Sequence, residues 1–409
     1  MTGIIADKNL APQGKASYDW ARAHMQIFNS IMEKYQSSKP LRGIKLAFCL
    51  HITKETSVLV MSAQKLGAKI AICSANPLST QDDIAAFLSS KNILTYAWRG
   101  ESDSEYRECI MKVLQFGPNI VTDDGGDMHN TIFQVPSLKI LGGTEETTSG
   151  LARLRILHSS GKLNYPVVAV NDASTKHLFD NRYGTGQSAI DGLLRATGLL
   201  LAGKHVIVCG YGWVGKGIAS RARGMGAIVS VTEVDPLRAM EASMDGYTVS
   251  KLSICAGYAD FIITCTGQKH VISISEIIKM KSGVILANAG HFDTEIDIHS
   301  LHSKDKFPIQ VRPYVEQFTI QRKLVYLISR GRVLNLVGSE GSPPEVMSLS
   351  FANQLLSIIY IAKNYSKMLP GIYCVPKEID NYVAEAALRG MNIEIDKLSK
   401  MQRRYIGRQ

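Results

Sequence analysis

The chain has 409 residues, enough for two hydrophobic cores, and its content of 45% hydrophobic and 20% charged residues is typical of a folded globular protein. The formal net charge of +10 comes from scattered Lys and Arg residues, so no basic groove for nucleic acid is predicted. Charges such as Arg195 and Lys204 interrupt the most apolar stretches, and the N-terminus lacks a signal-peptide pattern, so neither a membrane span nor export is expected.

Short apolar runs alternate with amphipathic stretches along the chain. Strands are predicted at 44–50, 69–75, 93–98, 119–124 and 166–172, with helices at 57–66, 80–90 and 104–115 between them. A second series of strands is predicted at 205–210, 228–234, 261–267, 283–290 and 332–338. This alternation predicts an α/β fold with two doubly wound parallel-sheet domains.

Domain boundaries follow from these two series. The first α/β domain is predicted at 1–183 and the second at 184–343. Residues 344–376 are predicted to be helical and to complete the first domain, and residues 377–409 to form a helical tail. The seven cysteines are widely spaced and lie mainly in apolar runs, which predicts reduced core thiols and a cytoplasmic protein.

A glycine-rich loop follows the first strand of the second series. The segment "VIVCGYGWVGKGIA" spaces Gly210, Gly212 and Gly215 as G-x-G-x-x-G, and the next strand ends at Glu233, 18 residues beyond the last glycine. This context is typical of a Rossmann dinucleotide site with an acid for the ribose. The residues directly after Glu233 are Val, Asp and Pro, with no adjacent Arg, so NAD is favoured over NADP. The alternatives are a phosphate loop, in which Gly217 replaces the needed Ser or Thr, and a plain turn.

Polar clusters stand where predicted strands end, the edge at which open α/β sheets bind ligands. They include "CLHITKET", "VTDDGGDM", "GGTEETTSG", "NDASTKHLFDNRYGTGQS" and "NAGHFD". Lys176 and Asp180 are spaced i, i+4, so on a helix they share a face and can meet over one hydroxyl. Taken singly, each cluster is equally well a turn or a surface ion pair. His299 and His302 are expected to be exposed, and no metal site is predicted.

Nearly the whole chain resembles adenosylhomocysteinase, the S-adenosylhomocysteine hydrolase family. The segments that carry the resemblance, in family order and spacing, include "SANPLSTQDDIAAFL", "YAWRGES", "EVDPLRAMEASMDGY" and "NAGHFDTEID", beside the clusters and the glycine loop above. Trp213 in that loop and the end at Gln409 look like the family's shorter branch. The resemblance implies a substrate-binding first domain, an NAD-binding second domain and a homo-oligomer, a dimer or tetramer.

The resemblance also implies roles for individual residues. Thr53 and Glu55 would bind the adenine, while Glu146, Lys176 and Asp180 would bind the ribose hydroxyls, with Lys176 assisting loss of the 3′-hydroxyl proton. Transient oxidation at C3′ would acidify C4′–H, with Asp124 as the candidate base and Lys176 as its rival, and His51 and His291 would act at C5′. The residues implied to hold NAD are Thr147, Thr148, Ser149, Asn181, Gly210, Gly212, Trp213, Val214, Gly215, Glu233, Asn288 and Asn335.

Two positions depart from the family pattern. Ser149 replaces a third threonine and keeps the hydroxyl, so little effect on NAD is expected. Ser342 replaces the histidine of a Gly-His-Pro motif that lies beside the purine and gates the homocysteine channel. The sequence therefore favours hydrolysis of S-adenosylhomocysteine to adenosine and homocysteine. It leaves open a paralogue that dehydrates or hydrates C5′ of a related nucleoside, a non-catalytic NAD-binding regulator, and a neutral swap at Ser342.

Overall fold

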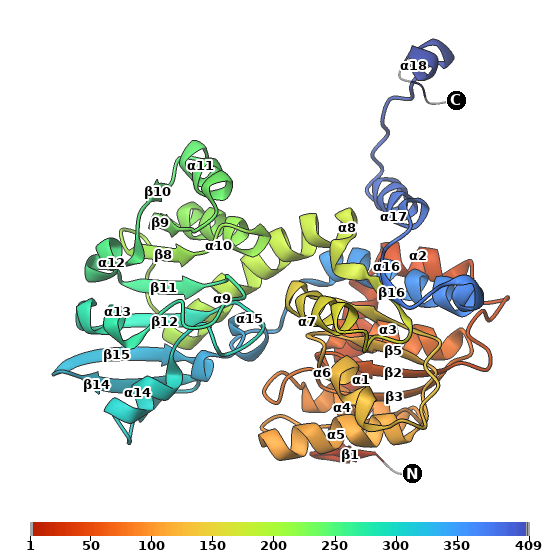
Figure 1. Cartoon of the computed structure of the whole chain (residues 1–409), viewed down its shortest axis with the longest axis horizontal. Coiled ribbons are helices and arrows are strands. Elements are labelled where there is room, and N and C mark those ends of the chain that lie inside the picture. Colours follow the sequence, from red (N-terminus) through yellow and green to blue (C-terminus); the bar gives the residue numbers. More distant parts are fainter. Residues whose placement is uncertain (1–2, 406, 408–409) are drawn as a thin grey trace.

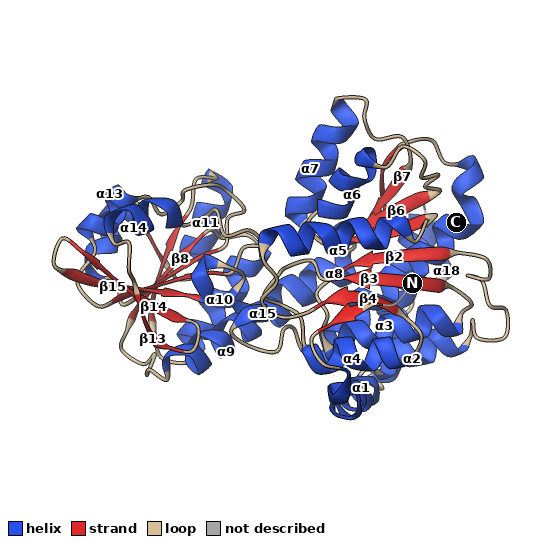
Figure 2. Ribbon diagram, turned by 90° about the horizontal axis from the view of Figure 1, so that it is seen from below, coloured by secondary structure: helices blue, strands red, loops and turns tan. Residues whose placement is uncertain are grey.

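The computed structural model describes residues 3–405 and 407 and contains two eight-stranded sheets, each flanked by helices (Figures 1 and 2). The first sheet is parallel throughout. Its order is β1 (Ile4–Ile5), β4 (Leu94–Ala97), β3 (Lys69–Cys73), β2 (Lys45–Cys49), β5 (Ile120–Asp123), β6 (Gly142–Glu145), β7 (Pro166–Ala169) and β16 (Gly371–Cys374). The strand order reverses between β2 and β5, which makes the carboxyl ends of these two strands the expected ligand site.

The second sheet combines parallel strands with a hairpin that the sequence analysis did not predict. Its order is β10 (Thr248–Val249), β9 (Ile228–Thr232), β8 (His205–Cys209), β11 (Phe261–Thr264), β12 (Val284–Asn288), β15 (Lys323–Ile328), β14 (Val315–Ile320) and β13 (Ile309–Arg312). Strands β13, β14 and β15 pair antiparallel, and the others pair parallel. The order reverses at β8, so the glycine loop lies at this second switch point.

Helices cover both faces of each sheet (Figure 2). Those around the first sheet are α1 (Ala11–His24), α2 (Gln26–Glu33), α3 (Lys54–Lys65), α4 (Asp82–Ser90), α5 (Asp103–Gln115), α6 (Asp127–Thr131), α7 (Thr148–Ser159), α8 (Ser174–Lys176), α16 (Pro344–Asn364) and α17 (Lys377–Gly390). Those around the second are α9 (Thr185–Thr197), α10 (Trp213–Gly224), α11 (Pro236–Met244), α12 (Leu252–Cys255), α13 (Ile274–Lys279), α14 (Ile298–Lys304) and α15 (Leu334–Val337). A π-helix, His177–Gly184, joins α8 to α9 between the two lobes.

The central strands of each sheet are buried on both faces, which explains why they read as continuous apolar runs. In β2, Leu46 and Phe48 belong to one core cluster, whereas Ala47 and Cys49 belong to another. In β8 the alternate residues likewise divide between two clusters. All seven cysteines are free, and five of them are buried, which agrees with the expected thiols.

Three predictions about elements need correction. Residues 332–338 were predicted as a strand, but Leu334–Val337 form helix α15, and the place beside β12 is taken by β15. A short buried apolar run has no periodicity that separates strand from helix. Residues 344–376 contribute strand β16 as well as helix α16, because β16 pairs with β7. The predicted helical tail is interrupted, since residues 391–399 lie between α17 and α18 (Lys400–Tyr405) without helix.

Among the described residues, one helix is long and apolar enough to span a membrane by length and composition, whereas no such stretch was expected. It extends over Pro344–Lys367, and 72% of its most apolar window is buried inside the protein. Its residues Leu355, Ile358 and Ile361 are fully buried in the core of the first domain. The burial explains the apolar composition of α16, which packs against α2, α3 and α17.

Candidate active site

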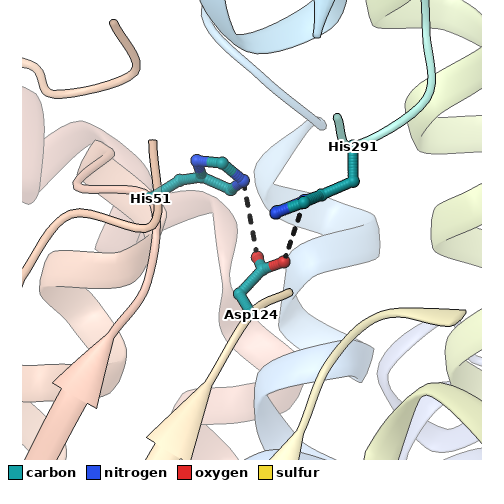
Figure 3. Close-up of side chains that lie close together, drawn as sticks. All are labelled: His51, Asp124 and His291. Carbon is teal, nitrogen blue, oxygen red and sulfur yellow. Dashed lines mark ion pairs between the residues drawn. The ribbon is translucent and has the colours of Figure 1, made fainter. Parts of the chain in front are cut away.

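The two domains bring three predicted side chains together at their interface. His51 follows β2 and Asp124 follows β5, so the switch point of the first sheet places them side by side, while His291 follows β12 of the second sheet. Asp124 lies 3.6 Å from His51, between Oδ2 and Nε2, and 3.6 Å from His291, between Oδ1 and Nδ1 (Figure 3). The two histidine rings are 5.7 Å apart between centroids. The cluster therefore exists only when both domains meet.

Burial sets the electrostatics of this cluster. Removal of water lowers the pKa of His51 to about 4, against the opposing effect of Asp124. The Nδ1 atom of His51 lies 2.7 Å from Ser79 Oγ, a contact that fixes the ring with Nε2 directed at Asp124. The Oδ1 atom of Asp124 is buried and has no hydrogen-bond partner among the described residues. A polar atom left in this state is suited to meet a ligand.

A second group of charged side chains lies at the π-helix. Lys176 Nζ lies 3.3 Å from Asp180 Oδ2 and donates a 2.8 Å hydrogen bond to Asn181 Oδ1. Lys176 and Asp180 therefore meet on one face, as their spacing predicted. Burial opposes the charge on Lys176, but the charges of Asp180, Glu146 and Asp124 raise its pKa. Burial raises the pKa of Glu146 to about 8, and its Oε1 has no partner among the described residues.

The predicted base-binding residues begin α3. Thr53 caps this helix by accepting from Thr56 N, and Glu55 in the first turn is 1% exposed. Burial raises the pKa of Glu55 against the attraction of Lys54, whose Nζ lies 3.3 Å from Glu55 Oε1. Ser342 lies two residues before α16, and its Oγ and Asp180 Oδ1 are 2.9 and 3.0 Å from the position that a Cβ on Gly184 would occupy. The structure therefore brings Ser342 beside the Lys176–Asp180 group.

The glycine loop has the shape of a dinucleotide cradle. Gly210 adopts a positive φ of 102°, and a Cβ on Gly215 would lie 2.0 Å from Gly210 O, so neither position accepts a side chain without strain. Helix α10 starts at Trp213 with no side-chain cap, which leaves its first amides free for a pyrophosphate. Glu233, at the end of β9, accepts from Tyr211 N at 2.7 Å and therefore stands beside the loop. These residues fit NAD.

Two other predicted cofactor residues differ in whether their side-chain amides are already hydrogen-bonded within the protein. Asn335 Oδ1 is buried without a partner among the described residues, as a ligand-binding amide should be. Asn288 is fully buried, and its amide already bonds Thr264, Phe292 and Gly331, so it holds the loop that carries His291.

The remaining cofactor candidates surround α7 and α10. Thr147 caps α7 and donates to Glu145, Thr148 accepts from Asn171, and Ser149 contacts Thr147. Trp213 stacks near His177 with ring centroids 5.2 Å apart, and Val214 is partly buried against the core of the second domain. His299 and His302 are exposed, as expected.

The sequence analysis included Asp123 and Glu145 in its strand-end clusters but did not predict the buried polar layer that they form beneath the active site. Glu145 accepts from Gly125 N and from Thr147 N, and Asp123 accepts from the backbone amides of Asp124 and His129. Burial raises the pKa of Asp123 to about 7 and that of Glu145 well above its ordinary value. Asp123 and Glu145 occupy the last positions of β5 and β6, and this position in a buried strand could have identified them. Asp124 and Glu146, which directly follow, were assigned the functional roles instead.

A cavity of about 470 Å³ opens beside the His291 end of the cluster. Its walls come from both domains and carry charges of both signs, including Asp103, Asp127, Arg153, Phe292 and Arg332. Arg153 donates to Asp127, and Arg332 lies 3.4 Å from both Asp103 and Asp293. Arg153 and Arg332 are therefore already paired with carboxylates of the same walls.

The Rossmann loop, the buried Lys–Asp pair and the paired histidines define an NAD-binding α/β enzyme with acid–base groups at the interface of its domains. The family model described as S-adenosyl-L-homocysteine hydrolase matches residues 3–139, and that described as its NAD binding domain matches residues 181–341. The chain belongs to the S-adenosyl-L-homocysteine hydrolase family.

Curated relatives align along almost the whole chain. The adenosylhomocysteinase of Sulfurisphaera tokodaii is 49% identical, with 98% of this chain and 97% of the relative covered. Proteins named S-inosyl-L-homocysteine hydrolase are 48% identical in Methanocaldococcus jannaschii, with 98% of each chain covered, and 49% identical in Methanopyrus kandleri, with 98% and 96% covered. The relatives thus carry two names that differ in the purine.

Proposed function

We propose that this enzyme hydrolyses a purine-nucleoside thioether of homocysteine, S-adenosylhomocysteine in the first instance, to the nucleoside and homocysteine. The observation that carries the proposal is the pairing of two acid–base groups. One is the buried Lys176–Asp180 pair, and the other is the cluster of His51, Asp124 and His291 contributed by both domains. The names of the curated relatives favour hydrolysis over a 5′-dehydratase or a non-catalytic regulator.

The second domain fits NAD because the first amides of α10 have no side-chain cap and Glu233 lies beside the glycine loop. When bound, it supplies a transient oxidation at C3′ of the ribose. The residues proposed to hold it are Thr147, Thr148, Ser149, Asn181, Gly210, Gly212, Trp213, Val214, Gly215, Glu233 and Asn335, with Asn288 positioning the His291 loop.

Different polar side chains then act in the different proton transfers of the reaction. Glu146 and Asp180 bind the ribose hydroxyls, and Lys176, held between Asp180 and Asn181, carries the proton of the 3′-hydroxyl. Asp124 is the base for the proton at C4′, which is acidic while C3′ is a ketone. His51 and His291 flank Asp124, so they protonate the leaving sulfur at C5′ and later activate the water that adds there.

Two measurements on the purified protein test this function. Mass spectrometry of incubations with S-adenosylhomocysteine should detect adenosine and homocysteine, and incubations with 5′-hydroxylated nucleosides should leave the nucleoside unchanged. Lys176→Ala should abolish reduction of bound NAD⁺ by adenosine, followed by the near-ultraviolet absorbance of NADH. Retained reduction would remove Lys176 from its role, and protein that neither carries nor binds NAD would exclude the oxidation.

The residues proposed to bind the purine base favour a second substrate class. Glu55 offers a buried acceptor for N6–H of adenine or N1–H of hypoxanthine, and Lys54 Nζ, 3.3 Å from Glu55 Oε1, is a donor that O6 of hypoxanthine requires and the amino group of adenine does not. We propose that Lys54 lets the enzyme accept S-inosylhomocysteine. Lys54→Met should lower kcat/KM for the inosyl substrate about 10-fold more than for the adenosyl one, because O6 is left unpaired. An equal loss with both substrates would show that Lys54 does not read the base.

Ser342 is proposed to widen the entrance beside the Lys176–Asp180 group. Its Oγ is close to Gly184, so a larger side chain would fill the gap between α16 and the π-helix. Ser342→His should raise KM for bulky 5′ substituents while leaving NAD content unchanged. No change in KM would make the position neutral.

We also propose that the protein is a homo-oligomer in the cytoplasm. Free cysteines support a reducing compartment, and the exposed apolar side chains of Met391, Ile393 and Ile395 support contact with another copy. Light scattering after size exclusion should give a mass above that of one chain, and fractionation of cells should place the protein with other cytosolic enzymes.

A further inference from the structure

Glu145, the last residue of β6, joins two segments that contact different ligands in the proposed reaction. Its Oε1 atom accepts three hydrogen bonds, from Gly125 N at 2.9 Å, from Thr147 N at 2.9 Å and from Thr147 Oγ1 at 2.7 Å. Gly125 directly follows Asp124, the proposed base at C4′, whereas Thr147 caps α7 and is proposed to contact NAD. A single carboxyl oxygen therefore fixes the loop of the base relative to the turn of the cofactor.

The carboxyl group of Glu145 fills a space that a glycine of α7 leaves for it. A Cβ on Gly150 would lie 2.2 Å from Glu145 Cδ, so a side chain at that position would displace the carboxyl group. Gly125 has a φ of 108°, which only glycine adopts readily, and its carbonyl oxygen accepts from Arg153 of α7 at 2.8 Å. The N–H and the C=O of Gly125 are thus both held, one by Glu145 and the other by α7.

The neighbouring imidazole supplies no positive charge to this carboxyl group. Glu145 is fully buried, and a nitrogen of His129 lies within 4.8 Å of one of its oxygens. Burial lowers the pKa of His129 to about 4, so the ring is neutral. Both ring nitrogens are in use, since Nε2 contacts Thr144 O at 3.2 Å and Nδ1 contacts Tyr165 OH at 2.9 Å. Glu145 therefore acts as a hydrogen-bond acceptor rather than as the partner of a cation.

We propose that Glu145 is a positioning residue that couples the binding of NAD to the placement of Asp124. Contact of NAD with the turn at Thr147 holds the shared oxygen, and this oxygen holds Gly125 and the loop of the base. Coupling between two ligands is reciprocal, so a nucleoside that contacts Asp124 tightens the binding of NAD in return. The inference rests on the proposed function, because that function assigns Asp124 and Thr147 to the two ligands.

Exchange of bound NAD⁺ against isotopically labelled NAD⁺ in the holoenzyme, followed by mass spectrometry, tests the coupling. The nucleoside probe is 3′-deoxyadenosine, which lacks the hydroxyl that is oxidised. At saturation it should slow the exchange at least about 5-fold in the parent. Glu145→Met, which removes the acceptor, should abolish this slowing and lower kcat at least about 10-fold, while KM changes less.

Two further variants separate positioning from a general effect on the fold. Glu145→Gln keeps Oε1 as the acceptor for both amides, so its exchange and its kcat should stay close to those of the parent. The matched control, Glu101→Met, removes another buried carboxyl group of the same domain, which accepts from Trp98 N. It should leave the slowing and kcat unchanged even where its thermal transition falls as far as that of Glu145→Met.

The positioning role is wrong if 3′-deoxyadenosine does not slow exchange in the parent, or if folded Glu145→Met keeps the slowing and the parent kcat. Equal impairment of Glu145→Gln and Glu145→Met would also overturn it, because the acceptor would not be what matters. Should Glu145→Met fail to fold, Glu145→Asp takes its place, since its shorter side chain cannot accept from both amides. Failure of the parent to release homocysteine from S-adenosylhomocysteine would instead refute the proposed function, because the exchange is measured without that reaction.

Discussion

At the residue scale, this protein buries several carboxyl groups whose pKa values are raised by the removal of water. Glu101 is 5% exposed, with Oε1 accepting from Trp98 N and Oε2 unpartnered among the described residues. Burial raises the pKa of Glu101 to about 8 and that of Glu146 to a similar value. Such acids keep their proton near neutral pH, which changes both stability and chemistry with pH.

Glu101→Gln is expected to stabilise the protein at alkaline pH. The folded pKa of Glu101, about 8, lies above its ordinary value of 4.5, so the stability that its proton provides is complete below 4.5 and is lost as pH rises through 8. Gln keeps the acceptor for Trp98 N and cannot ionise. The variant should match the parent near pH 5 and melt about 2–4 °C higher near pH 9 by calorimetry. An equal gain at both pH values, or a gain in the exposed control Glu394→Gln, would contradict this origin.

Ser79→Ala is expected to slow catalysis without unfolding the protein. The hydroxyl of Ser79 contacts His51 Nδ1 at 2.7 Å and holds the ring toward Asp124. Loss of one such contact costs about 1–1.5 kcal/mol, so kcat should fall roughly 5–10-fold while KM changes less. Steady-state kinetics check this, with Ser159→Ala on the exposed end of α7 as the control. A changed KM with normal kcat would place Ser79 in binding rather than in positioning.

At the element scale, helix α10 contains a glycine that has no room for a side chain and another that has room. In α10, a Cβ on Gly215 would clash with Gly210 O at 2.0 Å, whereas a Cβ on Gly224 would meet no atom within 4 Å. Both residues belong to the same helix and have ordinary negative φ. Only the approach of the loop to the helix distinguishes them.

Gly215→Ala should therefore lose NAD, and Gly224→Ala should not. The clash in Gly215→Ala forces the loop away from the helix end, and overpacking of this kind costs about 1–3 kcal/mol. Gly224→Ala should be neutral or raise stability by up to about 1 kcal/mol, because Ala favours helix over Gly. Bound NAD, released by acid and quantified, together with the thermal transition, checks both. Equal NAD content in the two variants would contradict the proposed cradle.

One element was misassigned from its sequence. Residues 332–338 form an apolar run that was predicted as a strand, yet Leu334–Val337 form the short buried helix α15. Hydrophobicity reports burial, not the partner against which a segment is buried. Leu334 packs on Gly192 of α9, which is 142 residues away in the chain, and no local pattern contains this contact.

At the scale of the whole molecule, the C-terminal segment stands apart from both domains. The chain leaves α17 and reaches α18 away from the body of the first domain (Figure 1). Between them, Met391, Ile393, Ile395 and Leu398 are 45–64% exposed. Apolar side chains exposed in this number mark a contact surface.

Truncation after Gly390 should lower the mass of the particle but not the stability of the domains. The segment beyond α17 has no buried residue among those described, so its removal leaves both cores intact. Light scattering should show a smaller assembly, and the thermal transition and NAD content of the smaller particle should stay close to those of the parent. An unchanged mass would place the interface elsewhere.

The sequence determined by itself the two α/β domains, the dinucleotide loop and the separate strand-end clusters, because sheet faces, glycine spacing and strand ends are local features. It also placed Lys176 and Asp180 on one helical face. Only the tertiary structure decided that His51, Asp124 and His291 meet, since they follow three strands of two different sheets. The buried layer of Asp123 and Glu145, the commitment of Asn288 to its own loop and the place of Ser342 beside Gly184 were likewise decided by contacts between distant segments. Long-range packing and the removal of water set these properties, and neither is written in a local pattern.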